Sequence, residues 1–127
     1  MDLPEALRYT ESHEWVADNN DGTVTVGITA VATDQLGDLV YVELPQLGAD
    51  VVRGRECAVV ESTKAAADVY APVSGVVAAI NSNLSEHPER VNESPYETGW
   101  LFRVKLTDPS ELQKLLERDD YAKSAGV

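Results

Sequence analysis

Short stretches of alternating hydrophobic and polar residues recur along the chain. In 23–28 every second residue is a large aliphatic one, which predicts a half-buried strand. The turn-forming residues 19–22 come directly before it and predict a hairpin with a strand around Trp15. Further strand patterns, bounded by glycine, proline or other turn residues, occupy 38–44, 57–62, 69–73, 76–80 and 100–106.

The strand expected at 38–44 has one apolar face. Val40, Val42 and Leu44 stand at a period of two, and a proline follows directly and ends the strand. The later stretch 81–99 is polar and contains two prolines, so an ordered loop is expected there. Many short strands separated by glycine- and proline-rich turns predict a mainly β fold, either a small sandwich or a barrel.

Two segments favour helices. Residues 30–36 predict a short helix that ends at Gly37. The segment 108–118 predicts a C-terminal helix, with Asp108 as its N-cap and Glu111 at the third helical position. Its apolar stripe, expected to pack on the β-rich body, consists of Leu112, Leu115 and Leu116. The 127 residues fit a single domain spanning 1–127.

The formal net charge of −12 and the sequence pI near 4.4 narrow the range of partners. Nucleic acid and anionic membranes would repel such a surface, whereas basic patches on protein partners would attract it. No apolar run approaches the roughly 20 residues that span a bilayer.

The single cysteine, Cys57, cannot form an internal disulfide, and it lies in an apolar strand pattern. We expect it to pack in the core of a protein from a reducing compartment.

Signatures of an enzyme active site are largely missing. His13 and His87 are the only histidines, and neither has metal-ligand spacing to another His or Cys. No Gly-rich phosphate-binding loop and no nucleophile elbow occurs in the sequence. The sequence therefore favours a non-catalytic protein.

Lys64 is the residue best placed for chemistry. It is the only lysine before Lys105, and it stands at a polar tip between two apolar strand patterns. Glu61 and Asp68 flank it, and the alanines 65–67 leave little steric bulk beside it. A hairpin tip would present its amine to a modifying enzyme in a defined position. An ordinary exposed lysine in a turn is the alternative interpretation.

The stretch Glu61-Ser62-Thr63-Lys64-Ala65 resembles the attachment motif of lipoyl carriers. The whole chain resembles the glycine cleavage system H protein family, with Thr63 where the family commonly has Val and Cys57 where it often has an aromatic residue. This likeness implies a flattened barrel-sandwich hybrid, the fold of lipoyl and biotinyl carriers. Besides the attachment motif, the matching segments are 9–16, 26–29, 36–45, 71–75, 92–96 and 99–101.

The resemblance implies lipoic acid bound through an amide to Lys64. It also implies a shuttle that takes an aminomethyl group from the pyridoxal-phosphate-dependent glycine decarboxylase to the tetrahydrofolate-dependent aminomethyltransferase. Dihydrolipoyl dehydrogenase then reoxidises the carrier, and a lipoate ligase or lipoyl transferase attaches the cofactor. The hard chemistry would belong to those enzymes and to the cofactor. We expect a monomer in the bacterial or archaeal cytoplasm, or in the mitochondrial matrix if the sequence is a processed form.

A carrier of a hydrolysable group should fold its arm against its own surface. We expect Glu14, assisted by Ser12 and Asp68, to receive the ammonium group of the loaded arm, because a cation needs an anion as its partner. A surface position of Glu14 with no such role is the alternative. His13 either orients a carboxylate or packs, and the two tryptophans are expected in the core or at the barrel end.

Other carriers fit the motif less well. A biotinyl domain usually has Met on both sides of the lysine, where this chain has Thr63 and Ala65. The lipoyl domain of a 2-oxo-acid dehydrogenase is shorter and is usually fused through a flexible linker. An H-like protein that relays lipoate to other enzymes, and an unmodified interaction module, share the motif and stay open as alternatives.

Overall fold

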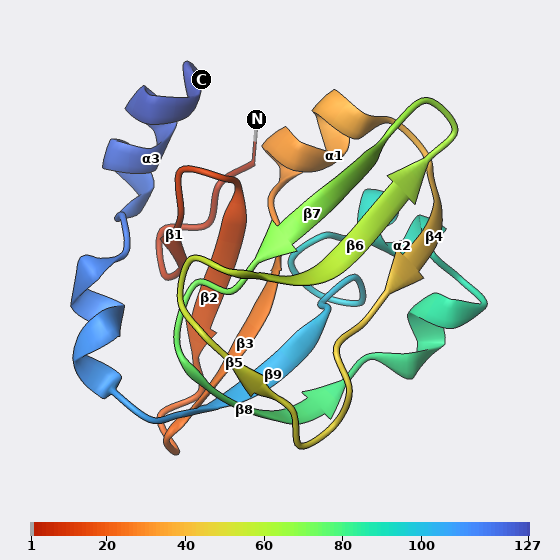
Figure 1. Ribbon diagram of the computed structural model, residues 1–127. Helices are drawn as coiled ribbons and strands as arrows, with labels where there is room; N and C mark the ends of the chain where they lie inside the picture. Colours follow the sequence, from red (N-terminus) through yellow and green to blue (C-terminus); the bar gives the residue numbers. More distant parts are fainter. Residues whose placement is uncertain (1) are drawn as a thin grey trace.

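Two antiparallel β-sheets form the body of the protein, whose computed structural model describes residues 2–127 (Figure 1). The larger sheet has the strand order β1-β2-β3-β9-β8-β5, and the smaller has the order β4-β6-β7. The predicted flattened, mainly β sandwich is confirmed, and its sheets do not close into a continuous barrel. The strands are β1 Arg8–Tyr9, β2 Glu14–Asp18, β3 Thr23–Ile28, β4 Leu39–Glu43, β5 Asp50–Val51, β6 Glu56–Ser62, β7 Ala66–Tyr70, β8 Gly75–Ile80 and β9 Phe102–Leu106.

One hydrophobic cluster joins the two sheets. Val26 and Phe102 of the larger sheet and Val60 and Val69 of the smaller sheet are at most 1% exposed and belong to it. Full burial of each such side chain stabilises the fold by roughly 1.5–3 kcal/mol. The alternation of apolar residues along β3 and β9 thus directs one face of these strands into the core, as the sequence pattern predicts.

Strand β4 differs from the pattern that the sequence predicts. Leu39 and Val42 are buried, whereas the side chains of Val40 and Tyr41 are 54% and 48% exposed. The pairing of β4 with β6 shifts its register between Leu39 and Tyr41. This irregularity turns Val40 away from the face of Val42, so the prediction is wrong for Val40, whereas Val42 and Leu44 both pack in the core as expected.

Helix α1 (Ala30–Leu36) has the bounds that the sequence predicts. Thr29 is its N-cap, and the Thr29 hydroxyl accepts a hydrogen bond from the Ala32 amide at 3.3 Å. Gly37 follows the helix at φ 79°, a conformation that a glycine adopts without steric cost. This position matters because Gly37 lies beside the tip of the β6–β7 hairpin.

The stretch 81–99, expected to be a loop, contains two short helical segments. These are the 3-10 helix η1 (Ser82–Ser85) and the helix α2 (Glu89–Glu93). The buried side chain of Asn81 closes the stretch by donating hydrogen bonds to the carbonyl oxygens of Thr98 and Trp100, at 2.9 and 2.8 Å. The long polar segment is therefore fixed at both ends.

The C-terminal helix expected at 108–118 is wrong in its extent. A 3-10 helix, η2 (Pro109–Lys114), begins at the predicted cap, where Asp108 accepts a hydrogen bond from the Ser110 amide at 3.1 Å. The carboxylate of Glu111 does not complete a capping box, because it accepts hydrogen bonds from the amide and hydroxyl of Ser74. Leu116 then pairs with Tyr9 as a β-bridge, which ends the helix, and a separate helix, α3 (Arg118–Ala125), follows.

This break also divides the predicted leucine stripe. Leu112 and Leu115 pack in the cluster between the sheets, whereas Leu116 packs with Tyr9 and Tyr121 in a second cluster beneath α3.

Within residues 2–127, none of the helices has the length and hydrophobicity that crossing a membrane requires.

We predict that Gly75→Ala destabilises the fold. A Cβ at Gly75 would overlap the carbonyl oxygen of Lys105 and the side chain of Val104, so the β8–β9 pair would have to separate. We expect a loss of about 2–3 kcal/mol in the free energy of unfolding, measured by urea denaturation. Ala78→Ser on the exposed face of the same strand is the control and should change stability by less than about 0.5 kcal/mol. Equal effects of the two substitutions would contradict this assignment.

Candidate cofactor-attachment site

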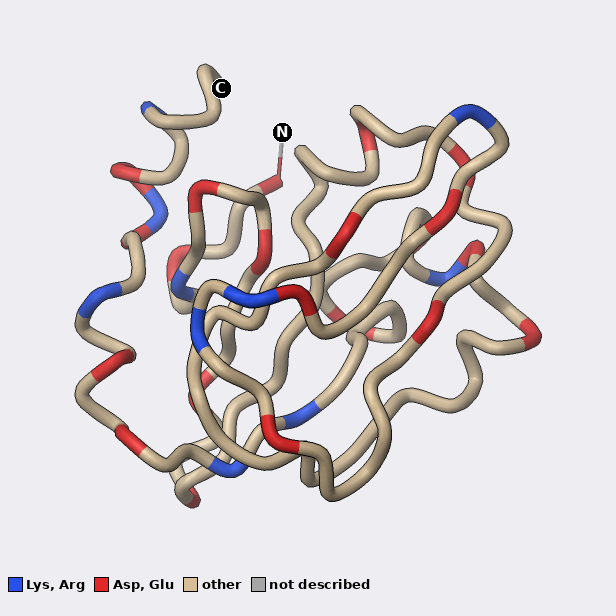
Figure 2. Tube along the Cα trace, viewed as in Figure 1, with Lys and Arg blue, Asp and Glu red and all other residues tan. Residues whose placement is uncertain are grey.

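Lys64 lies in the turn of the β6–β7 hairpin, at the end of the molecule that also carries α1 (Figures 1 and 2). Its side chain is exposed, and it takes part in no ion pair within residues 2–127. The two strands pair from Glu61 and Ala66 back to Glu56 and Tyr70, which fixes the base of the turn. The amine is therefore open to a modifying enzyme.

Ser62 orders this turn. Its amide donates a hydrogen bond to the carbonyl oxygen of Ala65 at 2.7 Å, and its hydroxyl accepts from the amides of Ala65 and Lys64 at 3.1 and 3.3 Å. Thr63 and Ala65 are exposed on either side of the lysine, and Glu61 is half-buried at the end of the strand pairing. These hydrogen bonds fix the backbone of the tip, from which the exposed Lys64 side chain extends.

The stem of Lys64 lies close to the loop after α1. A Cβ built on Gly37 would be 3.8 Å from Cε of Lys64. The side chain of Asn92 holds this loop, because it donates to the Gly37 carbonyl oxygen at 2.8 Å and accepts from the Leu39 amide at 2.9 Å. Sequence reasoning assigned no such role to Asn92, which lies 28 residues beyond the lysine in the chain.

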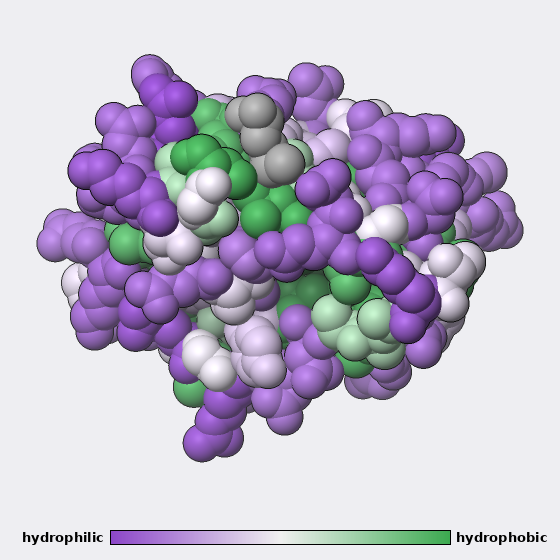
Figure 3. All heavy atoms as spheres, turned by 90° about the horizontal axis from the view of Figure 1, so that it is seen from above, coloured by the Kyte–Doolittle hydropathy of each residue, from purple (hydrophilic) through white to green (hydrophobic). Residues whose placement is uncertain are grey.

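A cavity of about 110 Å³ lies between α1 and β7 and extends to the turn before β2. Figure 3, which looks onto this end of the molecule, shows hydrophilic residues over most of the surface and apolar side chains in the hollows between them. The cavity combines aliphatic walls with a polar end. Its lining residues are Ser12, His13, Glu14, Ile28, Ala32, Gln35, Leu36, Val60, Ala67, Asp68 and Val69.

Glu14 is a buried carboxylate in the polar end of this cavity. Its side chain belongs to a residue that is only 1% exposed. The hydroxyls of Thr10 and Ser12 donate to its Oε1 at 2.6 and 2.5 Å, and the Tyr70 amide donates to its Oε2 at 3.3 Å. Burial raises the pKa of Glu14 above 4.5, and these three hydrogen bonds oppose the shift. The alternative interpretation, a surface position of Glu14, is thus excluded.

The structure brings the three predicted arm-stabilising residues together at one cavity. Ser12 and Asp68 are exposed at its edge and Glu14 is buried inside it, although they come from a turn and two different strands. Thr10 was not predicted, and its hydroxyl both accepts from the Glu14 amide at 3.0 Å and donates to the Glu14 carboxylate. The spacing of Thr10 and Glu14 would reveal this contact only once the tight turn between them is known.

Trp15 and Cys57, the other residues that the sequence singled out, contribute to packing. Trp15 is 2% exposed, and its indole nitrogen donates to the Pro95 carbonyl oxygen at 3.0 Å, so Trp15 packs as predicted. Cys57 is half-buried, and burial raises the pKa of its thiol to about 12, which keeps the thiol protonated and unreactive. Within residues 2–127, no group of three His, Cys, Asp or Glu side chains is arranged to hold a metal ion.

We predict that Glu14 makes the stability of the protein depend on pH. Its pKa in the folded state lies above the 4.5 expected in the unfolded chain, so the folded state binds more protons between these two values. The stabilising contribution of the protonated form is complete below about 4.5 and is lost as the pH rises through the folded-state pKa.

The difference in unfolding free energy between wild type and Glu14→Gln should therefore become more favourable to wild type as the pH falls from 7 towards 4.5. Urea denaturation at several pH values measures this difference. Glu11→Gln, on an exposed residue of the same turn, is the control and should show a smaller dependence. A difference that shrinks on acidification would contradict the raised pKa.

Comparisons with known proteins agree with this arrangement. The sequence profile of a family described as Glycine cleavage H-protein matches residues 7–126. The chain is 53% identical to the glycine cleavage system H protein of Vibrio vulnificus over 96% of this chain and 97% of that protein. It is 54% identical to the glycine cleavage system H protein of Pseudoalteromonas translucida over 94% and 93% of the two chains.

A solved structure has the same fold. The crystal structure of a glycine cleavage system H protein from Mycobacterium marinum superposes with a TM-score of 0.90. The sequences are 41% identical, and the superposition covers 98% of this chain and 100% of the other. Family profile, sequence relatives and structure agree over nearly the full length, so the chain belongs to the glycine cleavage H-protein family and is a carrier protein of the glycine cleavage system.

Proposed function

We propose that Lys64 is the attachment point of a lipoyl group, joined to its side-chain nitrogen by an amide. The observation that supports this most directly is the exposed amine of Lys64 on a turn whose backbone is fixed by Ser62. A ligase or lipoyl transferase that acylates one lysine needs such a defined position. This enzyme would also contact the neighbouring residues Glu61, Thr63 and Ala65.

The cavity beside β7 fits an aliphatic arm that ends in a cation. Ala67 lies three residues after Lys64, at most roughly 10 Å along the chain, and it already lines the cavity. Ile28, Leu36 and Val60 offer apolar contacts, and Glu14 supplies the only buried carboxylate within residues 2–127. These residues suit the stem of an acylated lysine and an ammonium group beyond it.

A bound lipoyl group would supply a dithiolane that accepts an aminomethyl unit from glycine decarboxylase, yields it to the aminomethyltransferase and is reoxidised by dihydrolipoyl dehydrogenase. The residues of this chain hold the cargo. Glu14 pairs with the ammonium group, and the hydroxyls of Ser12 and Thr10 keep its carboxylate oriented. The aliphatic walls and α1 limit the access of water to the carbon–sulfur bond, and Asp68 adds negative charge at the edge.

This chain tethers the aminomethyl group and protects it from water, and the partner enzymes catalyse the reactions. The net charge of −12 would speed its encounter with partners that present a basic surface. The predicted monomeric state and the predicted location, in the cytoplasm or the mitochondrial matrix, are part of the same proposal.

A relay of lipoate to other enzymes is the second candidate function, because it would use the same exposed Lys64. Purified decarboxylase, transferase and dehydrogenase, mixed with the lipoylated protein, glycine, tetrahydrofolate and NAD⁺, distinguish the two when a parallel mixture contains a lipoyl transferase and an acceptor protein. Release of carbon dioxide in repeated turnovers supports the glycine cleavage shuttle. Lipoyl transfer to an acceptor protein without glycine turnover would support the relay instead.

We predict that protein from lipoate-replete cells gains the mass of one lipoyl group on Lys64. Intact-mass spectrometry should show this gain in the wild type and in Lys123→Ala, and its complete loss in Lys64→Ala. Lys123 is an exposed lysine on α3 and serves as the matched control. A wild type of unmodified mass, or a modified Lys64→Ala protein, would refute the attachment site.

We further predict that Glu14→Gln accelerates hydrolysis of the aminomethyl-loaded protein. The amide of glutamine cannot form an ion pair with the ammonium group, so the loaded arm should leave the cavity more often. A hydrogen bond to a charged group is worth roughly 1.5–3 kcal/mol, which corresponds to an acceleration of at least about tenfold in ammonia release. Glu11→Gln should release ammonia at the wild-type rate, and an equally slow release from Glu14→Gln would remove the proposed role of Glu14.

A further inference from the structure

The hydroxyl of Tyr121 in α3 contacts two segments beside the cavity, the turn before β2 and the N-terminus of α1. It is 2.6 Å from Nδ1 of His13, which precedes Glu14, and 2.8 Å from Oγ1 of Thr29, which caps α1. Tyr121 and Thr29 are fully buried. One hydroxyl from the C-terminal helix thus connects the turn before Glu14 to the N-terminus of α1, and residues of both line the cavity.

The directions of these hydrogen bonds follow from the number of protons available. The Thr29 hydroxyl accepts from the Ala32 amide, and within residues 2–127 the Tyr121 oxygen is the only acceptor for its own proton. Because a buried hydroxyl proton without an acceptor is costly, Thr29 donates to Tyr121. Tyr121 then donates its single proton to Nδ1 of His13, so the His13 ring carries its proton on Nε2.

The backbone at His13 needs such a restraint. His13 has φ 76°, in the left-handed region that most side chains avoid. Its carbonyl oxygen accepts from the Thr29 amide at 3.0 Å, and its ring meets the Tyr121 ring edge to face, with centroids 5.7 Å apart. Since Glu14 follows directly, the backbone angle at His13 determines where the Glu14 carboxylate points.

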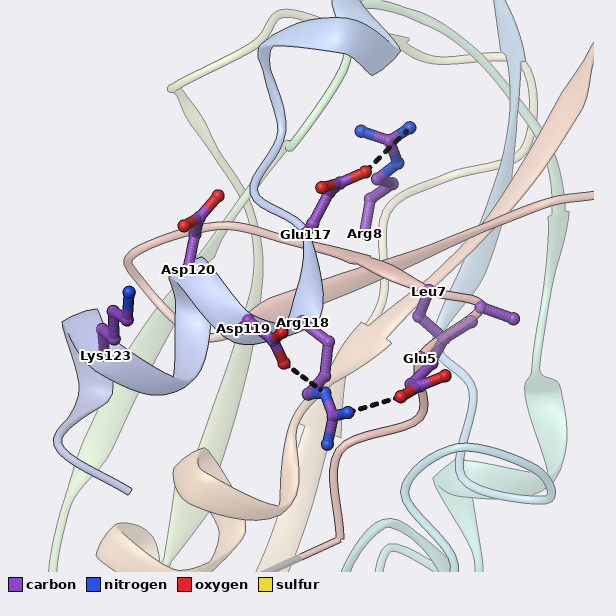
Figure 4. Close-up of a pocket in the computed structure, with 9 residues that line it drawn as sticks. Glu5, Leu7, Arg8, Glu117, Arg118, Asp119, Asp120 and Lys123 are labelled. Atoms are coloured by element: carbon purple, nitrogen blue, oxygen red, sulfur yellow. Dashed lines mark hydrogen bonds and ion pairs between the residues drawn. The ribbon is translucent and has the colours of Figure 1, made fainter.

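The attachment of α3 depends on these buried contacts more than on its surface charges. Figure 4 shows Arg118 bridging Glu5 and Asp119, and Arg8 beside Glu117, in an open groove between the N-terminal segment and α3. Such exposed ion pairs contribute little stability. In contrast, the rings of Tyr121 and Tyr9 stack in parallel at 4.7 Å and bury both side chains.

We propose that Tyr121 is a positioning residue that sets the spacing between the Glu14 turn and α1, and so determines how well the cavity holds a loaded arm. The proposal rests on the proposed function of the cavity. It assigns to the C-terminal helix a part in carrier function, because α3 itself lines none of the cavity. A ring without its hydroxyl would keep the packing of α3 and remove the side-chain link between the turn and α1, while the hydrogen bond from the Thr29 amide to the His13 carbonyl oxygen remains.

Tyr121→Phe tests this proposal, with Tyr9→Phe as its matched control. Each variant removes one buried hydroxyl from the same stacked pair, but the Tyr9 hydroxyl donates to the Pro4 carbonyl oxygen at 2.6 Å, away from the cavity. Ammonia release from the aminomethyl-loaded protein should be about three- to tenfold faster in Tyr121→Phe, the factor that one neutral hydrogen bond is worth. Tyr9→Phe should release ammonia at the wild-type rate, and equal rates in the two variants would overturn the proposal.

Nitrogen NMR of His13 in unmodified protein gives a second measurement that needs no cofactor. Wild type should show one tautomer with the proton on Nε2, whereas Tyr121→Phe should show both tautomers. Burial lowers the pKa of His13, and loss of the Tyr121 donor should raise it, with Glu14 and Asp68 as the nearby acids at the cavity. An unchanged His13 spectrum in Tyr121→Phe would refute the positioning role, even if the cavity proved to bind no arm.

His13→Phe provides an independent check should Tyr121→Phe fold poorly. It removes the same hydrogen bond from the other end, so its ammonia release should rise by a similar factor. The double variant should be no faster than the faster single variant, because both substitutions remove one interaction. Additive effects would show that the two residues act separately. A wild type that gives no protection at all would instead refute the proposed function of the cavity.

Discussion

The burial of Glu14 is the constraint on which the functional end of the molecule depends. A carboxylate removed from water is costly unless hydrogen bonds and charge compensate it. Here two hydroxyls and one amide donate to it, but no cation is paired with it within residues 2–127. The fold therefore maintains a partly compensated negative charge beside an apolar cavity, and a cation that enters this cavity would supply what is missing.

The turn before β2 and the β6–β7 hairpin supply the hydrogen-bond donors for the Glu14 carboxylate. The tight turn from Thr10 to Glu14 places two hydroxyls within reach of one carboxylate oxygen. The hairpin β6–β7 supplies the Tyr70 amide at one end and presents Lys64 at the other. A single pair of strands thus connects the attachment point to the Tyr70 amide that binds the buried charge, and its pairing is continuous from Glu61 and Ala66 to Ala58 and Val69.

The sequence predicted those features that depend on local periodicity and missed those that depend on distant contacts. The hairpin with Lys64, the strand β3 and the helix α1 each follow from neighbouring residues. The prediction for Val40 in β4 was wrong because pairing with β6 shifts register there. The role of Tyr121 could not be predicted, because it acts on His13, which lies 108 positions away in the chain.

The same reasoning explains why a small and partly open cavity suits a shuttle. Apolar contacts in about 110 Å³ can hold an alkyl chain only weakly, and each buried methylene contributes roughly 0.8 kcal/mol. An ion pair with desolvated Glu14 adds to this only while the arm bears an ammonium group. Under the proposed function, transfer of the carbon unit removes that cation and with it the stronger part of the interaction. The cavity would therefore retain a loaded arm and release an empty one without any change in the fold of the protein.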